Sequence, residues 1–159
     1  MFERRHNVCC LLLLTAILGG CGKDYYQIGL EGVINKDYEK ALSSFEKASK
    51  EGDGRASFIL GEMHEKGIGT PKSPEKAFAY YKLSSEAGFS KGVQKLIDCY
   101  YKGEGTPKNY EKAFALSLKQ AEKGDRFGQT SVGLLYYWGQ GVDKNLCEAR
   151  KWYSRASGQ

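Results

Sequence analysis

The sequence repeats itself every 36 residues, and this period constrains the fold more than any other feature of the chain. The dipeptide Lys-Ala occurs at 40–41, 76–77 and 112–113, and Glu-Ala at 148–149 continues the series. Three glycine columns keep the same spacing, at 52, 88 and 124, at 67, 103 and 139, and at 69, 105 and 141. A period of roughly 20–50 residues is typical of solenoids, in which each unit packs mainly against its two neighbours.

Each period predicts two helices. In the first full repeat, the first helix runs from about Arg55 to Lys66, with Ala56, Leu60 and Gly61 on one face at helical spacing. The Gly-x-Gly segment ends this helix, because glycine readily adopts the left-handed conformation of a C-cap. The second helix starts after a good N-capping residue in every copy, namely Asp37, Ser73, Asn109 and Asn145. Its buried face is expected to carry Ala41, Phe45 and Ala48, then Ala77 and Tyr81, Ala113 and Ser117, and Ala149 and Tyr153.

We therefore expect an all-α fold, an α-solenoid of antiparallel helix pairs. Three full repeats are expected at 53–88, 89–124 and 125–159. Residues 25–52 are expected to form a degenerate N-terminal pair that acts as a cap, because its first helix lacks the Gly-x-Gly that ends the later ones.

These columns resemble the Sel-one-like repeat family, a subset of the tetratricopeptide-like solenoids. The residues that carry the resemblance are Leu60-Gly61, Gly67-Ile-Gly69, Lys76-Ala77, Tyr80-Tyr81, Val132-Gly133, Tyr136, Gly139 to Val142, Ala149 and Trp152-Tyr153. Residues 25–52, with Tyr-Glu-Lys-Ala-Leu at 38–42, look more like a generic tetratricopeptide unit. Three departures, His64 for tyrosine, Ile97 for glycine and Ser117 for an aromatic residue, are expected to weaken individual packing sites. The resemblance implies a superhelix that binds another protein.

The first 21 residues predict a membrane-targeting leader. Arg4 and Arg5 precede an apolar run from 8 to 18, which is too short for the roughly 20 residues that cross a bilayer. The run ends in Leu18-Gly19-Gly20-Cys21, which resembles the bacterial lipobox. The resemblance implies a signal peptide at 1–20, a lipid on Cys21 and a short tether at 21–24, with Gly22 favouring the outer membrane. An ordinary secretory signal or an uncleaved anchor are the alternatives.

Few residues in the sequence favour catalysis or a cofactor. The net charge of +5 comes from interleaved acids and bases with no basic stripe, so the sequence does not point to nucleic-acid binding. After the leader, His64 is the one histidine, and it takes the column of Tyr100 and Tyr136, so we interpret it as a core residue. Two Ser-x-x-Lys matches, starting at Ser44 and Ser73, fall on repeat positions and lack the companion motifs of penicillin-recognising enzymes. We expect no cofactor, no metal and no small-molecule substrate.

Two cysteines follow the leader. Cys99 is expected in the first helix of its repeat and Cys147 near the start of the second helix of the next. A bond between them is one alternative, and burial of Cys99 as a small apolar side chain is the favoured one.

The predicted partner surface lies on the first helix of each repeat. By analogy with tetratricopeptide geometry, residues that flank the Leu-Gly column face the concave side. The favoured positions are Phe58, Glu62, Glu65, Asp98, Tyr101, Phe127, Leu134, Tyr137 and Trp138. Their character changes from charged to apolar along the chain. Leu134, Tyr137 and Trp138 form either an apolar contact for a partner or a surface that packs under the last helix or a further cap.

The leading hypothesis is a non-catalytic protein-interaction scaffold, anchored by lipid in the bacterial cell envelope and facing the periplasm from the outer membrane. Its partner is another protein, either a secreted effector or an envelope protein. A narrower alternative is an immunity protein that neutralises a secreted antibacterial phospholipase, because some lipoproteins of this repeat family resemble the chain in length and architecture. An alternative from another class is a hydrolase acting on cell-wall or β-lactam substrates.

Overall fold

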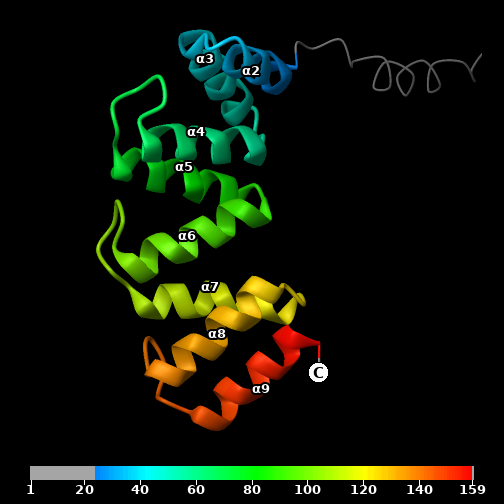
Figure 1. The fold of residues 1–159 in the computed structure, drawn as a ribbon, viewed down its shortest axis with the longest axis vertical. Coiled ribbons are helices and arrows are strands. Elements are labelled where there is room, and N and C mark those ends of the chain that lie inside the picture. Colours follow the sequence, from blue (N-terminus) through cyan, green and yellow to red (C-terminus); the bar gives the residue numbers. More distant parts are fainter. Residues whose placement is uncertain (1–23, 159) are drawn as a thin grey trace, which may run out of the picture.

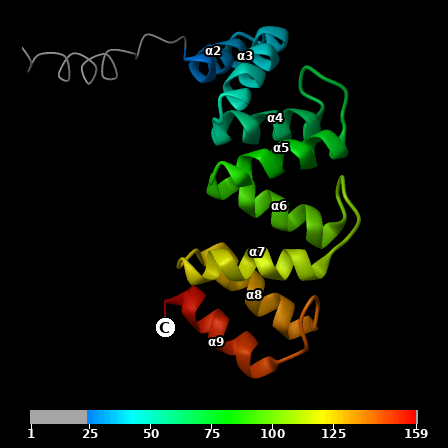
Figure 2. The ribbon, with the colours of Figure 1, turned by 180° about the vertical axis from the view of Figure 1, so that it is seen from behind.

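The computed structural model describes residues 24–158, which form α-helices and contain no strand. The helices are α2 (Tyr25–Ile34), α3 (Tyr38–Lys50), α4 (Gly54–Lys66), α5 (Pro74–Glu86), α6 (Ser90–Lys102), α7 (Tyr110–Glu122), α8 (Arg126–Trp138) and α9 (Leu146–Ser157). Figures 1 and 2 show them stacked in chain order along the long axis, from α2 and α3 at one end to α9 at the other. The predicted α-solenoid is confirmed, with the pairs α4/α5, α6/α7 and α8/α9 preceded by the degenerate pair α2/α3.

The predicted leader and its lipidated cysteine, Cys21, lie outside the described residues. None of the helices between residues 24 and 158 is long and apolar enough to cross a membrane.

The predicted caps are at the helix ends. Asp37, Ser73, Asn109 and Asn145 each accept a backbone N–H of the helix that they begin. Gly67, Gly103 and Gly139 end α4, α6 and α8 in the left-handed conformation. These local hydrogen bonds satisfy groups that a helix leaves unpaired at its ends, which explains why short sequence signals located the helices well.

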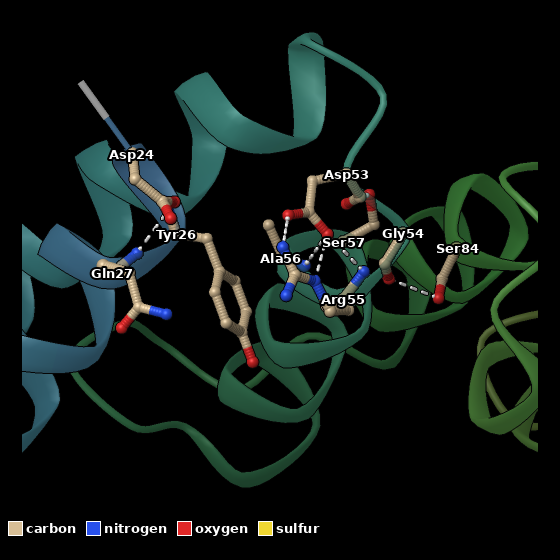
Figure 3. A network of polar contacts seen from close by, with 9 residues as sticks. All are labelled: Asp24, Tyr26, Gln27, Asp53, Gly54, Arg55, Ala56, Ser57 and Ser84. Carbon is tan, nitrogen blue, oxygen red and sulfur yellow. Dashed lines mark hydrogen bonds and ion pairs between the residues drawn. The ribbon is translucent and has the colours of Figure 1, made fainter. Parts of the chain in front are cut away.

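Two further caps anchor the first two helix pairs (Figure 3). Asp24 accepts backbone N–H groups of Tyr26 and Gln27 at the start of α2. Asp53 does the same for α4 and pairs with the Arg55 guanidinium at 2.7 Å. The Arg55 guanidinium also lies 4.1 Å from the centre of the Tyr26 ring, so one side chain links the cap of α4 to α2.

Within a pair, a glycine on the first helix faces an aromatic ring on the second. A Cβ atom at Gly29 would lie 2.5 Å from the Phe45 ring, and one at Gly133 would lie 2.9 Å from the Tyr153 ring. Gly61 stands in the same tight contact with Tyr81. The sequence alone gave no role to Gly29, because the loop after α2 is shorter and takes this residue out of the 36-residue spacing.

The pair α6/α7 reverses this arrangement of a small residue on the first helix and a large one on the second. Ile97 stands where the other pairs have glycine, and Ser117 stands where they have an aromatic residue. Both are buried, at 3% and 0% exposure. The larger side chain thus lies on the first helix and the smaller one on the second, which keeps their combined size close to that of a glycine and an aromatic ring. The buried Ser117 hydroxyl has no hydrogen-bond partner among the described residues, and the expected weakening of this packing site stays a prediction.

The second glycine of each Gly-x-Gly brings the loop against the preceding repeat. A Cβ atom at Gly105 or Gly141 would collide with the backbone carbonyl of Pro74 or Tyr110, at the start of the second helix one repeat earlier. A Cβ atom at Gly69 would collide with the side chain of Tyr38, also at the start of the second helix one repeat earlier. This column therefore sets the contact between successive repeats, in addition to ending a helix.

The core is divided among the pairs and their junctions. One cluster joins α3 and α4 through Ala41, Phe45, Ala56, Leu60 and neighbouring side chains, and three smaller clusters follow along the solenoid. Tyr153, which the repeat pattern placed on a buried face, is 36% exposed, whereas its equivalent Tyr81 is 1% exposed. The difference arises because α6 covers α5 and no described helix covers the outer face of α9.

Candidate functional site

The first helices of the repeats lie along one side of the solenoid. Besides its two chain neighbours, α4 contacts α6, two helices further along, so these two first helices lie on the same side of the stack. Each of the nine favoured partner-surface residues is at least partly accessible: Phe58, Glu62, Glu65, Asp98, Tyr101, Phe127, Leu134, Tyr137 and Trp138. They extend from α4 through α6 to α8, but their surroundings differ.

Three of the aromatic candidates are held by intramolecular packing. The Phe58 ring lies 5.9 Å from the Tyr81 ring and 5.5 Å from the Phe89 ring. The Tyr101 ring lies 5.4 Å from that of Tyr110, and Phe127 packs against the cluster between α6 and α7. These half-buried rings join neighbouring helices, so they offer a partner only an edge.

The charged candidates on α4 form ion pairs. Glu62 pairs with Lys66 at 3.0 Å on the surface of α4. Glu65 accepts the Tyr81 hydroxyl and pairs with Lys95 of α6 at 2.8 Å. Burial raises the pKa of Glu65, but the hydrogen bonds from Lys95 and Tyr81 outweigh it and leave this pKa below its ordinary value. Glu65 thus ties the first repeat to the second, in addition to being partly accessible.

Asp98 lies at a pocket between α4, α5 and α6. The pocket has a volume of about 210 Å³ and is lined by both acids and lysines, including Glu65, Lys95 and Lys102. Burial raises the pKa of Asp98, although Lys102 and Lys95 oppose this shift. The acids and the lysines of the lining balance in number, so the pocket has no excess charge of either sign.

Leu134, Tyr137 and Trp138 form the most exposed apolar surface among the candidates, which we call the α8 patch. Their exposed fractions are 37%, 44% and 59%. The Tyr137 and Trp138 rings meet edge to face, with centroids 4.9 Å apart. The sequence left two roles open for these side chains, contact with a partner or packing under the last helix. In the structure they are not buried under α9.

The residues considered for catalysis have structural roles. The Ser73 hydroxyl accepts the Lys76 backbone N–H at the start of α5, and Ser44 is buried inside the helix pair α2/α3. His64 is buried and its ring stacks on Tyr80 at 5.4 Å between centroids, as expected for a core residue. Among residues 24–158 no group of acids, histidines and cysteines is arranged to hold a metal ion.

The two cysteines lie on different helices. Cys99 is buried in α6 against Ala77 and Tyr81, which confirms its role as an apolar core side chain, and burial raises the pKa of its thiol to about 11. Cys147 is exposed near the start of α9. Both thiols are free.

Solved structures with the same fold include longer and shorter chains. A protective antigen of uropathogenic Escherichia coli that displays an SLR fold is 29% identical over 96% of this chain and 34% of its own, with a TM-score of 0.79. A Sel1 repeat protein from Oxalobacter formigenes is 32% identical over 82% of this chain and 54% of its own, with a TM-score of 0.71. Cysteine rich protein B of Helicobacter pylori is 25% identical over 77% of this chain and 87% of its own, with a TM-score of 0.56.

This chain therefore spans about a third of the first of these proteins and about half of the second. No match was found among curated proteins. The family model described as the Sel1 repeat matches four consecutive segments, 17–53, 54–89, 98–125 and 127–159. Since these segments cover most of the sequence, the chain belongs to the Sel1 repeat family.

Proposed function

We propose that this protein is a non-catalytic interaction scaffold, held at the bacterial cell envelope by a lipid on Cys21, and that the α8 patch is its main contact with a partner protein. Sel1 repeat proteins generally serve as protein-interaction scaffolds, and their fold is generally non-catalytic. The α8 patch is the observation that carries the proposal for this chain.

The composition of the α8 patch supports a role in binding. Leu134, Tyr137 and Trp138 expose large apolar side chains on two successive turns of α8. Aromatic side chains dominate the binding energy of protein interfaces, because they bury a large apolar area and lose little conformational freedom. The charged positions at the equivalent sites of α4 and α6 would form a polar border, which is the usual surrounding of such a contact.

The anchor is supported by the leader. Its two arginines, its apolar run and the sequence Leu18 to Cys21 fit a lipoprotein signal, and Gly22 favours the outer membrane. Stable attachment needs more than one acyl chain, and a lipidated N-terminal cysteine would carry them. The solenoid would then face the periplasm.

Trp138→Ala tests the binding role. Cells that carry a photo-crosslinking residue at position 134 are irradiated, and the crosslinked partner is identified and purified. We expect Trp138→Ala to weaken binding to that partner by roughly 30-fold, the effect of one interface hot spot. The helical circular dichroism spectrum should not change, and Leu83→Ala, which alters an exposed leucine on α5, serves as the matched control. Loss of helix in Trp138→Ala would show a core role instead, and unchanged affinity would refute the proposal.

Two measurements address the finer parts of the proposal. Metabolic labelling with a clickable fatty acid should mark the wild-type chain and not the Cys21→Ser variant, and equal labelling would refute the anchor. If the partner is a secreted phospholipase, the purified chain should abolish its lipid hydrolysis, as the immunity alternative requires. A partner whose activity is unaffected would exclude that role and leave the scaffold in place.

A further inference from the structure

We propose that the outer face of α9 docks one amphipathic helix of a partner protein, in the position that the first helix of a following repeat would take, with a carboxylate of that helix against Arg150. We call this surface the α9 face and define it by Tyr137, Leu146, Ala149, Arg150 and Tyr153. The inference rests on the proposed function because it assumes a protein partner, and it names the structural class of that partner.

The α9 face repeats a surface that is covered elsewhere in the molecule. Ala149 and Tyr153 of α9 follow Ala77 and Tyr81 of α5 by two periods of 36 residues. On α5 these residues are covered by α6, which packs Cys99 against both. Lys95 of α6 places its ammonium group 5.5 Å from the centre of the Tyr81 ring. The contact that a helix makes with this kind of surface is therefore already present in the chain.

The same surface on α9 forms an open apolar groove. Its volume is about 550 Å³, and its lining consists of Tyr137, Leu146, Ala149, Arg150, Tyr153, Ser154 and Ser157. Leu146 is 55% exposed and Tyr153 is 36% exposed. Exposed apolar side chains that adjoin along a helix are typical of an interaction surface, and here they continue the stacking interface of the solenoid.

Arg150 distinguishes the α9 face from the covered surfaces. The equivalent residues, Phe78 and Phe114, meet Tyr100 and Tyr136 of the next first helix edge to face, at 5.5 and 5.2 Å between ring centroids. On α9 the equivalent position carries the guanidinium group of Arg150 in place of an aromatic ring. Among the residues that the structure describes around the groove, none is acidic. A partner helix with a carboxylate at the position of Tyr100 would supply the missing charge, because arginine pairs well with carboxylates.

A second copy stacked head to tail, with its α2 on the α9 face, is a poor occupant. The paired ring contacts Tyr26–Phe45 and Phe58–Tyr81, both at 5.9 Å, align α2 with α4 at an offset of 32 residues. At this offset, exposed polar residues of α2 take the places that apolar residues take in α4. The pairs are Asp24 for Ala56, Gln27 for Ile59 and Glu31 for Met63. The exposed apolar residues of α2, Val33 and Ile34, stand instead at the places of Glu65 and Lys66, so α2 does not repeat the apolar stripe that α4 packs against α3.

The test uses peptides with the sequence of α6, the helix that covers α5. Residues 89–103 of this chain are synthesised with acetylated and amidated ends and a fluorescent label, once unchanged and once with Tyr100→Glu. Fluorescence anisotropy measures the binding of each peptide to the full chain. We expect saturable binding, with the Tyr100→Glu peptide bound roughly tenfold more tightly than the unchanged one, the effect of one charge pair.

Variants of the full chain show where the peptide binds. Leu146→Glu should weaken binding of the Tyr100→Glu peptide by at least roughly tenfold, because it places a like charge in the groove. Arg150→Glu should reverse the preference, so that a Tyr100→Lys peptide binds best. Leu83→Glu, at a leucine of α5 that is 47% exposed, should have no effect, and circular dichroism checks that every variant is folded.

Three results would overturn the inference. The first is that neither the unchanged nor the Tyr100→Glu peptide binds saturably to the full chain. The second is that the Tyr100→Glu peptide binds the Leu146→Glu variant as tightly as the wild type. The third is that the Arg150→Glu variant does not prefer the Tyr100→Lys peptide. Self-association in sedimentation that Leu146→Glu abolishes would also overturn it, because the α9 face would then hold a second copy. The α8 patch and the α9 face share Tyr137, whose ring contacts Trp138, so the two roles are separated with Leu134→Ala, at a patch residue that does not line the groove. Leu134→Ala should weaken binding of the crosslinked partner and leave peptide binding unchanged, so failure of this inference is separable from failure of the role of the α8 patch.

Discussion

Ile97 and Ser117 suggest how packing between the two helices of a repeat is set in this solenoid. What matters is the combined size of two facing side chains, one from each helix. Glycine lies opposite an aromatic ring in three of the four pairs, and in the pair α6/α7 the same positions carry the buried residues Ile97 and Ser117. Interiors are packed densely enough that the loss of one side chain volume must be offset by another nearby. Each partner therefore has a defined size only in the presence of the other.

A double-mutant cycle tests this pairing. Ile97→Gly should destabilise the chain by about 3–5 kcal/mol, since it creates a cavity and adds a helical glycine. Ser117→Phe should cost about 1–3 kcal/mol through overpacking against Ile97. The double variant restores the arrangement of Gly29 with Phe45 and should lose less than the sum, by at least about 1 kcal/mol. Urea unfolding measures each free energy, and additive losses would contradict the pairing.

His64 is a second residue whose role depends on its surroundings. Its ring stacks on Tyr80 in a buried site, and its Nδ1 has no hydrogen-bond partner among the described residues. Burial is the main cause that lowers the pKa of His64, and the positive charge of Lys76 adds to it, while Glu46 acts in the opposite direction. The folded state therefore prefers the neutral imidazole.

This preference predicts a stability change with pH. Because the folded pKa lies below the unfolded value of about 6.5, the neutral ring stabilises the fold fully above that pH. The stabilisation should decline as the pH falls from about 6.5 through the lower folded pKa. His64→Tyr, which installs the residue found at Tyr100 and Tyr136, should remove this slope between pH 7 and 5. Urea unfolding at several pH values measures it, and identical slopes in the two proteins would show that His64 does not contribute.

At the scale of the elements, the helices are ended by glycines that serve different contacts. Gly103 ends α6, whereas Gly105, two residues later, sets the loop against the backbone of Pro74 in the preceding repeat. Gly88 has a similar left-handed conformation after α5 but has nothing within 4 Å of the position of a Cβ atom. The same residue type therefore has a local role at one site and a tertiary role at the other.

A comparison of Gly105→Ala with Gly88→Ala separates these roles. Both residues have positive φ angles, +70° and +79°, so both substitutions carry the same backbone strain of about 1 kcal/mol. Gly105→Ala should lose at least about 2 kcal/mol more, because its Cβ atom must displace the backbone of another repeat. Thermal and urea unfolding of the two variants check the difference. Equal losses would mean that the loop moves away freely.

The helix α6 shows a different exchange at its start. Asp53 and Asp125 cap α4 and α8 with their side chains, whereas the equivalent Phe89 makes no side-chain cap. The Phe89 ring instead packs edge to face on Phe58 of α4, at 5.5 Å between centroids. A tertiary contact has thus replaced a local hydrogen bond, which is why capping patterns did not mark this helix start.

At the scale of the whole molecule, stability in a solenoid depends on how many neighbours each repeat has. The helices α5 and α9 are equivalent in sequence, but α5 is covered on both sides and α9 on one. Tyr81 is 1% exposed and Tyr153 36% exposed for this reason. The two ends of the stack should therefore open more readily than its centre.

Hydrogen–deuterium exchange tests this gradient. Backbone amides of α9 should exchange faster than those of α5, because local opening of α9 breaks contacts with only one neighbouring helix. The acidic α6 peptide should slow exchange in α9 and leave α5 unchanged if it occupies the α9 face. Mass spectrometry of peptic fragments measures both rates. Equal protection of α5 and α9 in the free chain would contradict this account.

The sequence predicted most of the fold because its signals act locally. The N-caps from Asp37 to Asn145 and the left-handed glycines such as Gly67 each depend on one or two turns of chain, and the 36-residue period gave their order. The sequence also predicted which helix surface a partner would meet, and the binding roles of Glu62, Leu134 and Trp138 remain predictions. It missed Gly29 and Gly32, whose packing against Phe45 and Ala41 lies outside the exact period.

Tertiary structure alone decided which repeated residues are buried. Tyr81 and Tyr153 occupy the same position in the repeat, and only the presence or absence of a covering helix separates a core residue from a surface one. In the same way, Ile97 and Ser117 depart from the sequence pattern, and the structure shows that both are buried. Helix formation is encoded within about one turn of chain, whereas burial depends on the neighbouring unit, so the sequence by itself determined the helices and the stack determined their exposed faces.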